Sequence, residues 1–216
     1  MVLFALLALA GCMAALSPEE QAAPQAAKPA GSEELVVAGG CFWCLEPLFE
    51  RLKGVYAVEV GYAGGNSAKT TYEEVCTGLT GHAEALKLTY DPKVITADDL
   101  LRIFFTIHDP TTLNRQGPDE GPQYRSAVFY RTDEEKQRAQ AIIDEITKER
   151  IWKGRIVTTL EPLKNYSRAE EYHQDYYEKF QKAGPLEKMG MNAGYCRVVI
   201  DPKVTKFRQK FSHLMK

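Results

Sequence analysis

The sequence of 216 residues lacks several features that mark well-defined classes of protein. Lysine and arginine (27) do not outnumber aspartate and glutamate (29), so the charge balance does not indicate nucleic-acid binding. No apolar run reaches the ~18 residues that a membrane-spanning helix needs. No internal repeat is visible. With 44% hydrophobic residues, the chain is long enough to bury the core of one globular domain.

Cysteine is also scarce, with five in the whole chain. Cys12 belongs to the N-terminal leader, which leaves Cys41, Cys44, Cys76 and Cys196. Four cysteines over so long a domain do not make a disulfide scaffold. A zinc site of paired cysteines would need two sets, and only one Cys-x-x-Cys occurs, so no metal is expected. The pattern favours redox chemistry.

The first 32 residues differ in composition from the rest. Residues 2–10 form an apolar run of the length of a signal-peptide core, and Leu9-Ala10-Gly11-Cys12 resembles a bacterial lipoprotein processing box. We therefore expect a signal peptide and lipobox at 1–12 with Cys12 lipidated, a flexible linker at 13–32 rich in Ala, Pro and Gln, and a folded domain at 33–216.

This leader predicts a lipid-anchored protein of the cell envelope or periplasm. The positive charges that usually precede the apolar run are missing. Either the true N-terminus lies upstream of Met1 or the leader is not functional, in which case the protein is cytoplasmic and the segment is an ordinary disordered terminus.

The stretch 39–46, Gly-Gly-Cys-Phe-Trp-Cys-Leu-Glu, lies between an apolar run typical of a strand (35–38) and apolar residues at helical spacing (45–52). Cys41 is thus predicted at a strand-to-helix turn. Free N–H groups at a helix start lower the pKa of a thiol toward a usable thiolate. Phe42 and Trp43 add aromatic surface beside the sulfur. The pattern indicates a nucleophilic cysteine at an apolar pocket; the alternative is a buried, inert cysteine.

The rest of the chain alternates between strand and helix patterns. Strands are predicted at 55–62, 83–90, 124–131 and 156–160, a short element at 72–76, and a long loop at 109–122. Helices are predicted after Thr96, after Thr132 with Glu135 completing a capping box, from Ser167 to Phe180, and at 204–214. The expected fold is an α+β two-layer sandwich with a mixed, ferredoxin-like sheet, packing helices and a long irregular C-terminal segment.

Several motifs recur in the order found in one known family. They are Gly-Gly-Cys-Phe-Trp (39–43), Gly-Tyr-Ala-Gly-Gly (61–65), Gly-His-Ala-Glu (81–84), His-Asp-Pro (108–110), Gln-Tyr-Arg-Ser (123–126) and Tyr-His-Gln-Asp-Tyr (172–176). From about Leu35 to Tyr177 the sequence resembles the A-type peptide methionine sulfoxide reductases. The resemblance implies reduction of free and protein-bound methionine sulfoxide, of the S epimer, and hence repair of oxidised proteins.

The resemblance also implies roles for particular residues. Cys41 matches the nucleophile, and Phe42 and Trp43 match the cradle for the substrate's S-methyl group. The family's polar residues around the sulfoxide oxygen correspond to Tyr72, Glu84, Asp119 and Tyr124.

These assignments agree with the chemistry of the sulfoxide. A thiolate that attacks the sulfur pushes charge onto the oxygen, which must then be protonated. Glu84 can supply that proton if burial keeps it neutral. Tyr72 and Tyr124 can donate hydrogen bonds to the oxygen, and Asp119 is expected to fix a bound water or one of the tyrosines. The products are methionine and a cysteine sulfenic acid.

The sequence does not decide which second thiol reacts with the Cys41 sulfenic acid. The commonest family pattern has glycine where this chain has Cys44, and Cys196 falls near where other members keep a resolving cysteine. Either one, or both in sequence, can form the disulfide. Cys76 matches a family position without a chemical role and is expected in the core. The resemblance further implies a thioredoxin-like reductant and no bound cofactor, and we expect a monomer.

The histidines and two other functions complete the predictions. His82 and His108 are interpreted as structural, whereas His173 is either structural or lines the site. A thiol–disulfide oxidoreductase using Cys41 and Cys44 alone is the alternative enzyme. An envelope lipoprotein that binds partners through Trp43 and the tyrosines is the alternative without catalysis.

Overall fold

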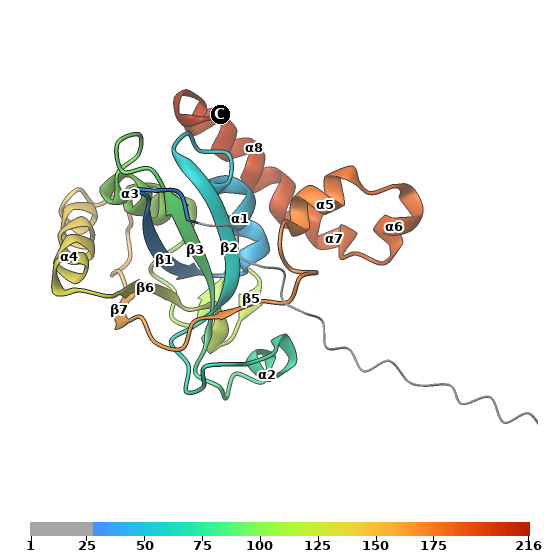
Figure 1. Ribbon diagram of the computed structural model, residues 1–216, viewed down its shortest axis with the longest axis horizontal. Coiled ribbons are helices and arrows are strands. Elements are labelled where there is room, and N and C mark those ends of the chain that lie inside the picture. Colours follow the sequence, from blue (N-terminus) through green and yellow to red (C-terminus); the bar gives the residue numbers. More distant parts are fainter. Residues whose placement is uncertain (1–27) are drawn as a thin grey trace, which may run out of the picture.

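The computed structural model describes residues 28–216. The predicted lipobox with Cys12 and most of the predicted linker lie outside the described residues. The chain forms a six-stranded sheet with helices packed on it (Figure 1). The strands lie in the order β7 (Thr159–Pro162), β6 (Ser126–Tyr130), β1 (Glu33–Gly39), β3 (Ala83–Tyr90), β2 (Val55–Ala63) and β8 (Ser167–Arg168).

The sheet is mixed, as predicted. β6 and β7 are parallel, and the other neighbouring strands are antiparallel. β1 pairs with both β3 and β6, so that Val37 lies opposite Leu86 on one side and Val128 on the other. This buried, β-branched strand ends at Gly39 and delivers Cys41 to the end of the sheet.

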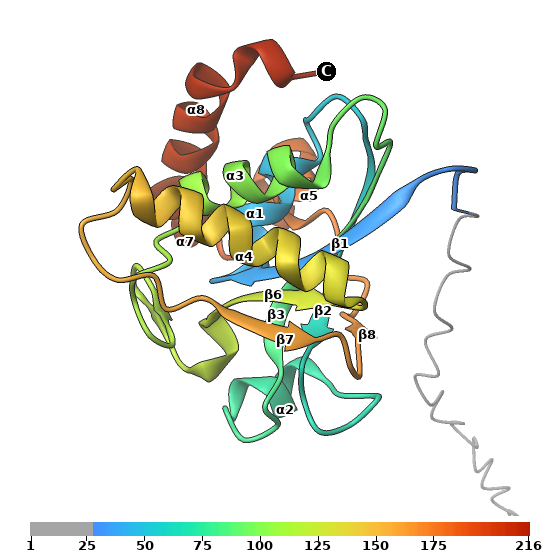
Figure 2. The same cartoon turned by 90° about the vertical axis from the view of Figure 1, so that its left-hand side faces the viewer.

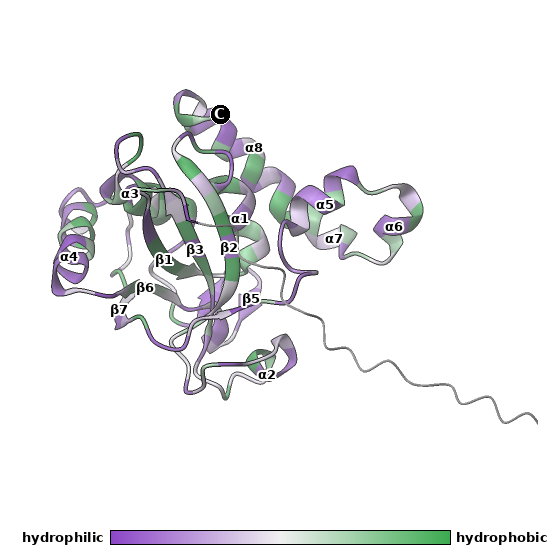
Figure 3. Ribbon diagram, viewed as in Figure 1, coloured by the Kyte–Doolittle hydropathy of each residue, from purple (hydrophilic) through white to green (hydrophobic). Residues whose placement is uncertain are grey.

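Three helices cover one face of the sheet: α1 (Phe42–Phe49), α3 (Ala97–Ile107) and α4 (Asp133–Lys148) (Figure 2). The main core lies between them and the strands. The outward side of α4 is hydrophilic, whereas the strands beneath are hydrophobic (Figure 3). The helices therefore follow the amphipathic patterns read from the sequence.

Side-chain caps begin α3 and α4. Thr96 and Asp99 form a reciprocal capping box at α3. At α4 the hydroxyl of Thr132 accepts the N–H of Glu135, as predicted. The Glu135 carboxylate, however, accepts the N–H of Arg131 at 2.7 Å rather than that of Thr132, so the predicted capping box forms only in part.

The opposite face of the sheet carries a smaller core of short side chains. Alanines from four strands and Phe129 pack there under Leu163 and Tyr166. Short side chains allow the chain that follows β7 to lie close to the sheet, where Asn165 hydrogen-bonds the carbonyl oxygen of Gly65.

The predicted helix from Ser167 to Phe180 was wrong in its first half. Residues 167–168 form the edge strand β8, and helix α5 (Tyr176–Lys182) begins later. The side-chain amide of Gln174 bonds both the N–H and the C=O of Val60 on β2. These bonds attach the turn at 171–175 to the sheet and override the local helical pattern of the segment.

Two predicted strands are shifted and the long loop has structure of its own. Tyr124 lies in a 3₁₀ turn (Pro122–Tyr124), so the strand begins at Ser126, and the strand expected at 156–160 is β7. The 109–122 loop contains a hairpin of β4 (Arg115–Gln116) and β5 (Asp119–Glu120). The short element at 72–76 is helix α2 (Tyr72–Cys76).

The C-terminal segment, expected to be irregular, is built of short helices and turns. In order they are α5, α6 (Pro185–Met189), α7 (Ala193–Tyr195), a π-helical turn (Cys196–Ile200), α8 (Asp201–Lys210) and a 3₁₀ turn (Ser212–Leu214). The last helix thus begins earlier than predicted. Among residues 28–216, no helix has the length and apolar character needed to cross a bilayer.

Candidate active site

Cys41 is the N-cap residue of α1, directly after the end of β1. The turn depends on Gly40, whose φ of +95° is unfavourable for other residues. A Cβ on Gly40 would also meet the side chain of Gln116 at 2.5 Å. The predicted strand-to-helix turn is therefore present, and it places the Cys41 thiol at a cavity.

The cavity has a volume of about 130 Å³ and collects every residue predicted for the chemical step. Its lining consists of Cys41, Phe42, Trp43, Tyr72, Glu84, Asp119, Tyr124, Asn192 and Tyr195. The first seven were selected from the sequence. Asn192 and Tyr195, from the C-terminal segment, were not. One hollow thus combines a thiol, two carboxyl groups, phenols and aromatic surface.

Glu84 projects from β3 and is only 1% exposed. Its Oε2 accepts the N–H of Phe42 at 3.0 Å. Burial outweighs this hydrogen bond and raises the pKa of Glu84 to about 8. The carboxyl group therefore holds a proton at neutral pH, as the sequence-based chemistry required.

The structure corrects the expected pKa of Cys41. Burial raises the pKa of this thiol well above its ordinary value. The helix start does not offset this effect of burial, because the N–H of Phe42 is directed at Glu84 and that of Cys44 bonds the carbonyl oxygen of Cys41 at 3.0 Å. A hydrogen bond from Cys41 lowers the pKa of Cys44 instead. The resting site holds the nucleophile as a thiol.

Tyr72 and Tyr124 are half-buried, and burial raises the pKa of both phenols, so each keeps its O–H as a donor. Tyr72 is held by Glu170, which was not predicted. Oε1 of Glu170 accepts the N–H of Tyr72, and Oε2 accepts the phenol of Tyr62, each at 2.8 Å.

Asp119 accepts a hydrogen bond from Tyr195, which was not among the tyrosines predicted from the sequence. The phenol of Tyr195 donates to its Oδ2 at 2.8 Å, and the same phenol oxygen lies 3.2 Å from Sγ of Cys44. Tyr195 thereby joins the β4–β5 hairpin to α1. Its position beside Cys196, in Gly194-Tyr195-Cys196, was the only signal in the sequence.

Aromatic rings form one wall of the cavity. The indole of Trp43 stacks on Tyr176 with centroids 3.8 Å apart and planes at 8°. Its Nε1 donates to Nδ1 of His173 at 3.1 Å, and the His173 ring lies 5.0 Å from that of Phe42. Burial lowers the pKa of His173 to about 4, so it is a neutral ring behind the wall rather than part of the lining.

The remaining cysteines differ in exposure. Cys44 is buried beside Cys41, and Cys196 is buried at the start of the π-helical turn, where burial raises its pKa to about 11. Cys76 was predicted in the core but is exposed, because α2 buries only Val75.

His82 and His108 are structural, as predicted. Nε2 of His82 lies 3.1 Å from the carbonyl oxygen of Ser67, and the buried His108 ring contacts Ser126 and the Phe104 carbonyl oxygen.

Comparison with known proteins decides the family. A sequence model described as peptide methionine sulfoxide reductase matches residues 33–215. The chain belongs to the peptide methionine sulfoxide reductase family. The family resemblance seen in the motifs is thereby confirmed, and it extends to nearly the whole chain that the structure describes.

Relatives within this reductase family are similar over most of their length. The peptide methionine sulfoxide reductase MsrA of Sulfolobus acidocaldarius is 49% identical over 179 residues, which cover 83% of this chain and 95% of that protein. The corresponding protein of Deinococcus radiodurans is 45% identical over 196 residues, 90% of each chain.

Solved structures of the same family share the fold. The methionine sulfoxide reductase A of Corynebacterium diphtheriae has a TM-score of 0.68 at 37% identity, covering 73% of this chain and 79% of that one. Reduced Mxr1 of Saccharomyces cerevisiae has a TM-score of 0.66 at 40% identity, covering 73% and 90%. The α+β class predicted from the sequence is confirmed.

Proposed function

We propose that this protein is a peptide-methionine (S)-S-oxide reductase, a thiol-dependent oxidoreductase that repairs free and protein-bound methionine sulfoxide. One observation carries the proposal: a buried carboxyl group that is neutral at pH 7 and two phenols line the same cavity as the Cys41 thiol, against an aromatic wall. A thiol–disulfide exchange enzyme would have no use for Glu84, Tyr72 and Tyr124.

In the proposed complex, the S-methyl group of the substrate packs on Phe42 and Trp43. The sulfoxide oxygen lies among Glu84, Tyr72 and Tyr124, which all carry protons. Donors that are already oriented stabilise charge as it develops on the oxygen, at little cost in reorganisation.

In the chemical step, the Cys41 sulfur attacks the sulfoxide sulfur and forms a bond to it. Glu84 gives its proton to the oxygen, and it receives the thiol proton of Cys41, which lines the same cavity. The new sulfur–sulfur bond and the sulfoxide S–O bond then break as the oxygen passes to Cys41. Thiol and sulfoxide thus become sulfenic acid and thioether with no net gain or loss of protons, while Cys41 is oxidised and the substrate reduced.

We propose that the two resolving cysteines act in sequence. Cys44 comes first, because its sulfur is hydrogen-bonded to that of Cys41 and its pKa is lowered. It attacks the Cys41 sulfenic acid, forming a disulfide and water. Cys196 then attacks the Cys44 sulfur, which frees Cys41, and a thioredoxin-like dithiol reduces the Cys44–Cys196 disulfide.

Mass spectrometry after one turnover tests this order. Cys41 and Cys44 lie on one tryptic peptide, so their disulfide makes that peptide lighter by two hydrogens, whereas a bond to Cys196 joins two peptides. Cys196→Ser should accumulate the first product. A Cys41–Cys196 bond as the major product in wild-type protein would overturn the order.

Two variants distinguish the reductase from its alternatives. The protein with both Cys44→Ser and Cys196→Ser should still convert one equivalent of methionine sulfoxide, because only Cys41 meets the substrate. A thiol–disulfide oxidoreductase would lose all activity in this variant. Failure of the wild-type protein to consume methionine sulfoxide with dithiothreitol would favour a binding protein without catalysis.

We further propose that Cys12 is lipidated and that the enzyme works as a monomer on the envelope side of the membrane. The apolar run at 2–10 followed by Gly11-Cys12 supports the anchor. In cells, Cys12→Ser should move the protein from the membrane fraction to a soluble one. A wild-type protein without lipid, recovered only from the cytoplasm, would contradict the anchor. Size-exclusion chromatography tests the monomer.

A further inference from the structure

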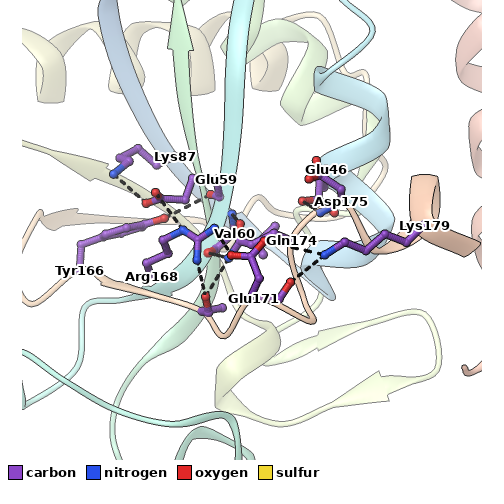
Figure 4. A network of polar contacts seen from close by, with 11 residues as sticks. Glu46, Glu59, Val60, Lys87, Tyr166, Arg168, Glu171, Gln174, Asp175 and Lys179 are labelled. Carbon is purple, nitrogen blue, oxygen red and sulfur yellow. Dashed lines mark hydrogen bonds and ion pairs between the residues drawn. The ribbon is translucent and has the colours of Figure 1, made fainter. Parts of the chain in front are cut away.

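Glu46 is a buried carboxyl group that the proposed chemistry does not use. It lies on α1 and is only 1% exposed. Its Oε1 accepts the N–H of Asp175 at 2.7 Å, and its Oε2 accepts the N–H of Tyr176 at 3.2 Å. Figure 4 shows Glu46 on α1 directly beside Asp175. One side chain therefore binds two successive backbone groups from a distant part of the sequence.

These backbone groups have no partner within their own helix. Asp175 is the N-cap of α5 with a left-handed φ of 51°, and Tyr176 is the first helical residue, so neither N–H can reach an earlier turn. Tyr176 is buried. Without Glu46, the structure would leave a buried donor unsatisfied, which is unfavourable.

Tyr176 connects Glu46 to the cavity. Its ring stacks face to face on Trp43, and its phenol oxygen accepts the N–H of Asn192 at 2.7 Å. Trp43 and Asn192 both line the cavity. A shift of Tyr176 would therefore move the aromatic wall and the C-terminal side of the site together.

We propose that Glu46 is a positioning residue for substrate binding: it fixes Tyr176 against Trp43 and so sets the wall that receives the S-methyl group. The inference rests on the reductase function proposed above. The residue directly before Asp175 is held independently, because Gln174 bonds Val60 on β2 (Figure 4). Glu46 thus controls the segment only where it turns into α5.

The neighbouring charges supply a matched control. The carboxylate oxygens of Glu46, Glu50 and Asp175 lie within 4.8 Å of one another. Glu50 is hydrogen-bonded to the side chain of Asp175, and it borders a surface hollow with Arg51 and Arg208 rather than the catalytic cavity. Glu50→Gln therefore changes the same group of carboxyls without touching the backbone at 175–176.

The first experiment compares Glu46→Gln, Glu46→Ala and Glu50→Gln with dithiothreitol as reductant. A glutamine at position 46 keeps one oxygen that can accept a backbone N–H of 175–176, and its NH₂ group cannot accept the other. We expect Glu46→Gln to raise KM for methionine sulfoxide about tenfold, with the single-turnover rate at saturating substrate changed less than about threefold. Glu50→Gln should leave both values unchanged. An unchanged KM in folded Glu46→Gln protein, or an equal rise in Glu50→Gln, would overturn the proposal.

A second readout reports on Trp43 directly. The chain has two tryptophans, so Trp152→Phe leaves Trp43 as the only one. In that background, Glu46→Gln should shift the emission to longer wavelength and increase acrylamide quenching. Unchanged emission would contradict the proposed positioning. This measurement needs no turnover, so it tests Glu46 even if the wild-type protein proves inactive on sulfoxides, an outcome that would refute the proposed function alone.

A double-mutant cycle tests whether Glu46 acts through Tyr176. Tyr176→Leu removes the stacking on Trp43. If Glu46 works by placing this ring, adding Glu46→Gln to Tyr176→Leu should raise KM by less than about twofold. If the rise in KM of the double variant equals the product of the rises in the two single variants, the two residues act independently and the proposal is overturned. The cycle uses only the Gln variant, so it decides the question even if Glu46→Ala does not fold.

Discussion

The N–H of Phe42 donates a hydrogen bond of 3.0 Å to Oε2 of Glu84, and this contact joins the start of α1 to β3. It uses the helix donor nearest the nucleophile to orient a carboxyl group. The Glu84 carboxyl group is thereby placed beside the cysteine, and this N–H is not available to stabilise a Cys41 thiolate. In the proposed reaction, this arrangement lets Glu84 deliver a proton to the substrate.

Glu84→Gln should slow formation of the Cys41 sulfenic acid by roughly 10²-fold or more, because the amide cannot give a proton to the sulfoxide oxygen. Gln retains an acceptor for the Phe42 N–H, so the local fold should persist. Single-turnover quench with a sulfenic acid probe measures the rate. Glu134→Gln, at an exposed carboxylate on α4, is the control. A near-normal rate in Glu84→Gln would remove Glu84 as the acid.

The single-turnover rate of the wild-type enzyme should fall as the pH rises through about 8. Burial raises the pKa of Glu84 to about 8, so the proton-donating form is lost above that pH. The residual rate of Glu84→Gln should lack this alkaline decline. A wild-type rate that stays constant to pH 9.5 would show that another group supplies the proton.

Glu84 should also make the fold less stable at alkaline pH. Its pKa is about 8 in the folded protein against an ordinary value of 4.5, so the folded state binds more protons between these values and stability falls as pH rises. At pH 8.5, Glu84→Gln should therefore be more stable than wild type by on the order of a few kcal/mol. At pH 4.5 this advantage should disappear.

Urea unfolding at the two pH values measures this difference. The shift in free energy of unfolding between pH 4.5 and 8.5 should be smaller in Glu84→Gln than in wild type. An equal shift in both proteins would assign the pH dependence to other buried carboxyls, such as Glu46.

Tyr195→Phe should speed the exchange step that involves Cys196. The phenol of Tyr195 bonds Asp119 and contacts Cys44, which holds the neighbouring Cys196 in its buried position. Loss of about 1 kcal/mol of hydrogen bonding should make release of this segment several-fold faster.

Alkylation at timed intervals, followed by mass spectrometry, measures the appearance of the Cys44–Cys196 disulfide. Tyr56→Phe, which removes an exposed phenol bonded to Asp91, is the control. A slower exchange in Tyr195→Phe than in wild type would mean that the phenol assists the thiol chemistry instead of restraining the segment.

Much of the fold could be predicted because its signals are local. The buried run in β1, the turn at Gly40 and the hydroxyl caps at Thr96 and Thr132 depend on residues close in sequence. The helix predicted from Ser167 failed because bonds between Gln174 and Val60, far apart in the chain, determine the conformation there.

The seven residues chosen for the chemical step could be named from motifs, and they converge on one cavity. Residues that position the side chains of the site, without reacting themselves, could not be found from motifs. Tyr195, Glu170 and Glu46 carry no distinctive pattern of their own. Their roles follow from hydrogen bonds to elements that are distant in the sequence.

The amino-acid sequence by itself determined the family, the α+β class and the residues proposed as nucleophile and acid, because these depend on residue types in local order. Only the tertiary structure decided the protonation states of Cys41 and Glu84, since burial and the direction of the Phe42 N–H set them. It alone also brought Cys44 and Tyr195 together beside the nucleophile.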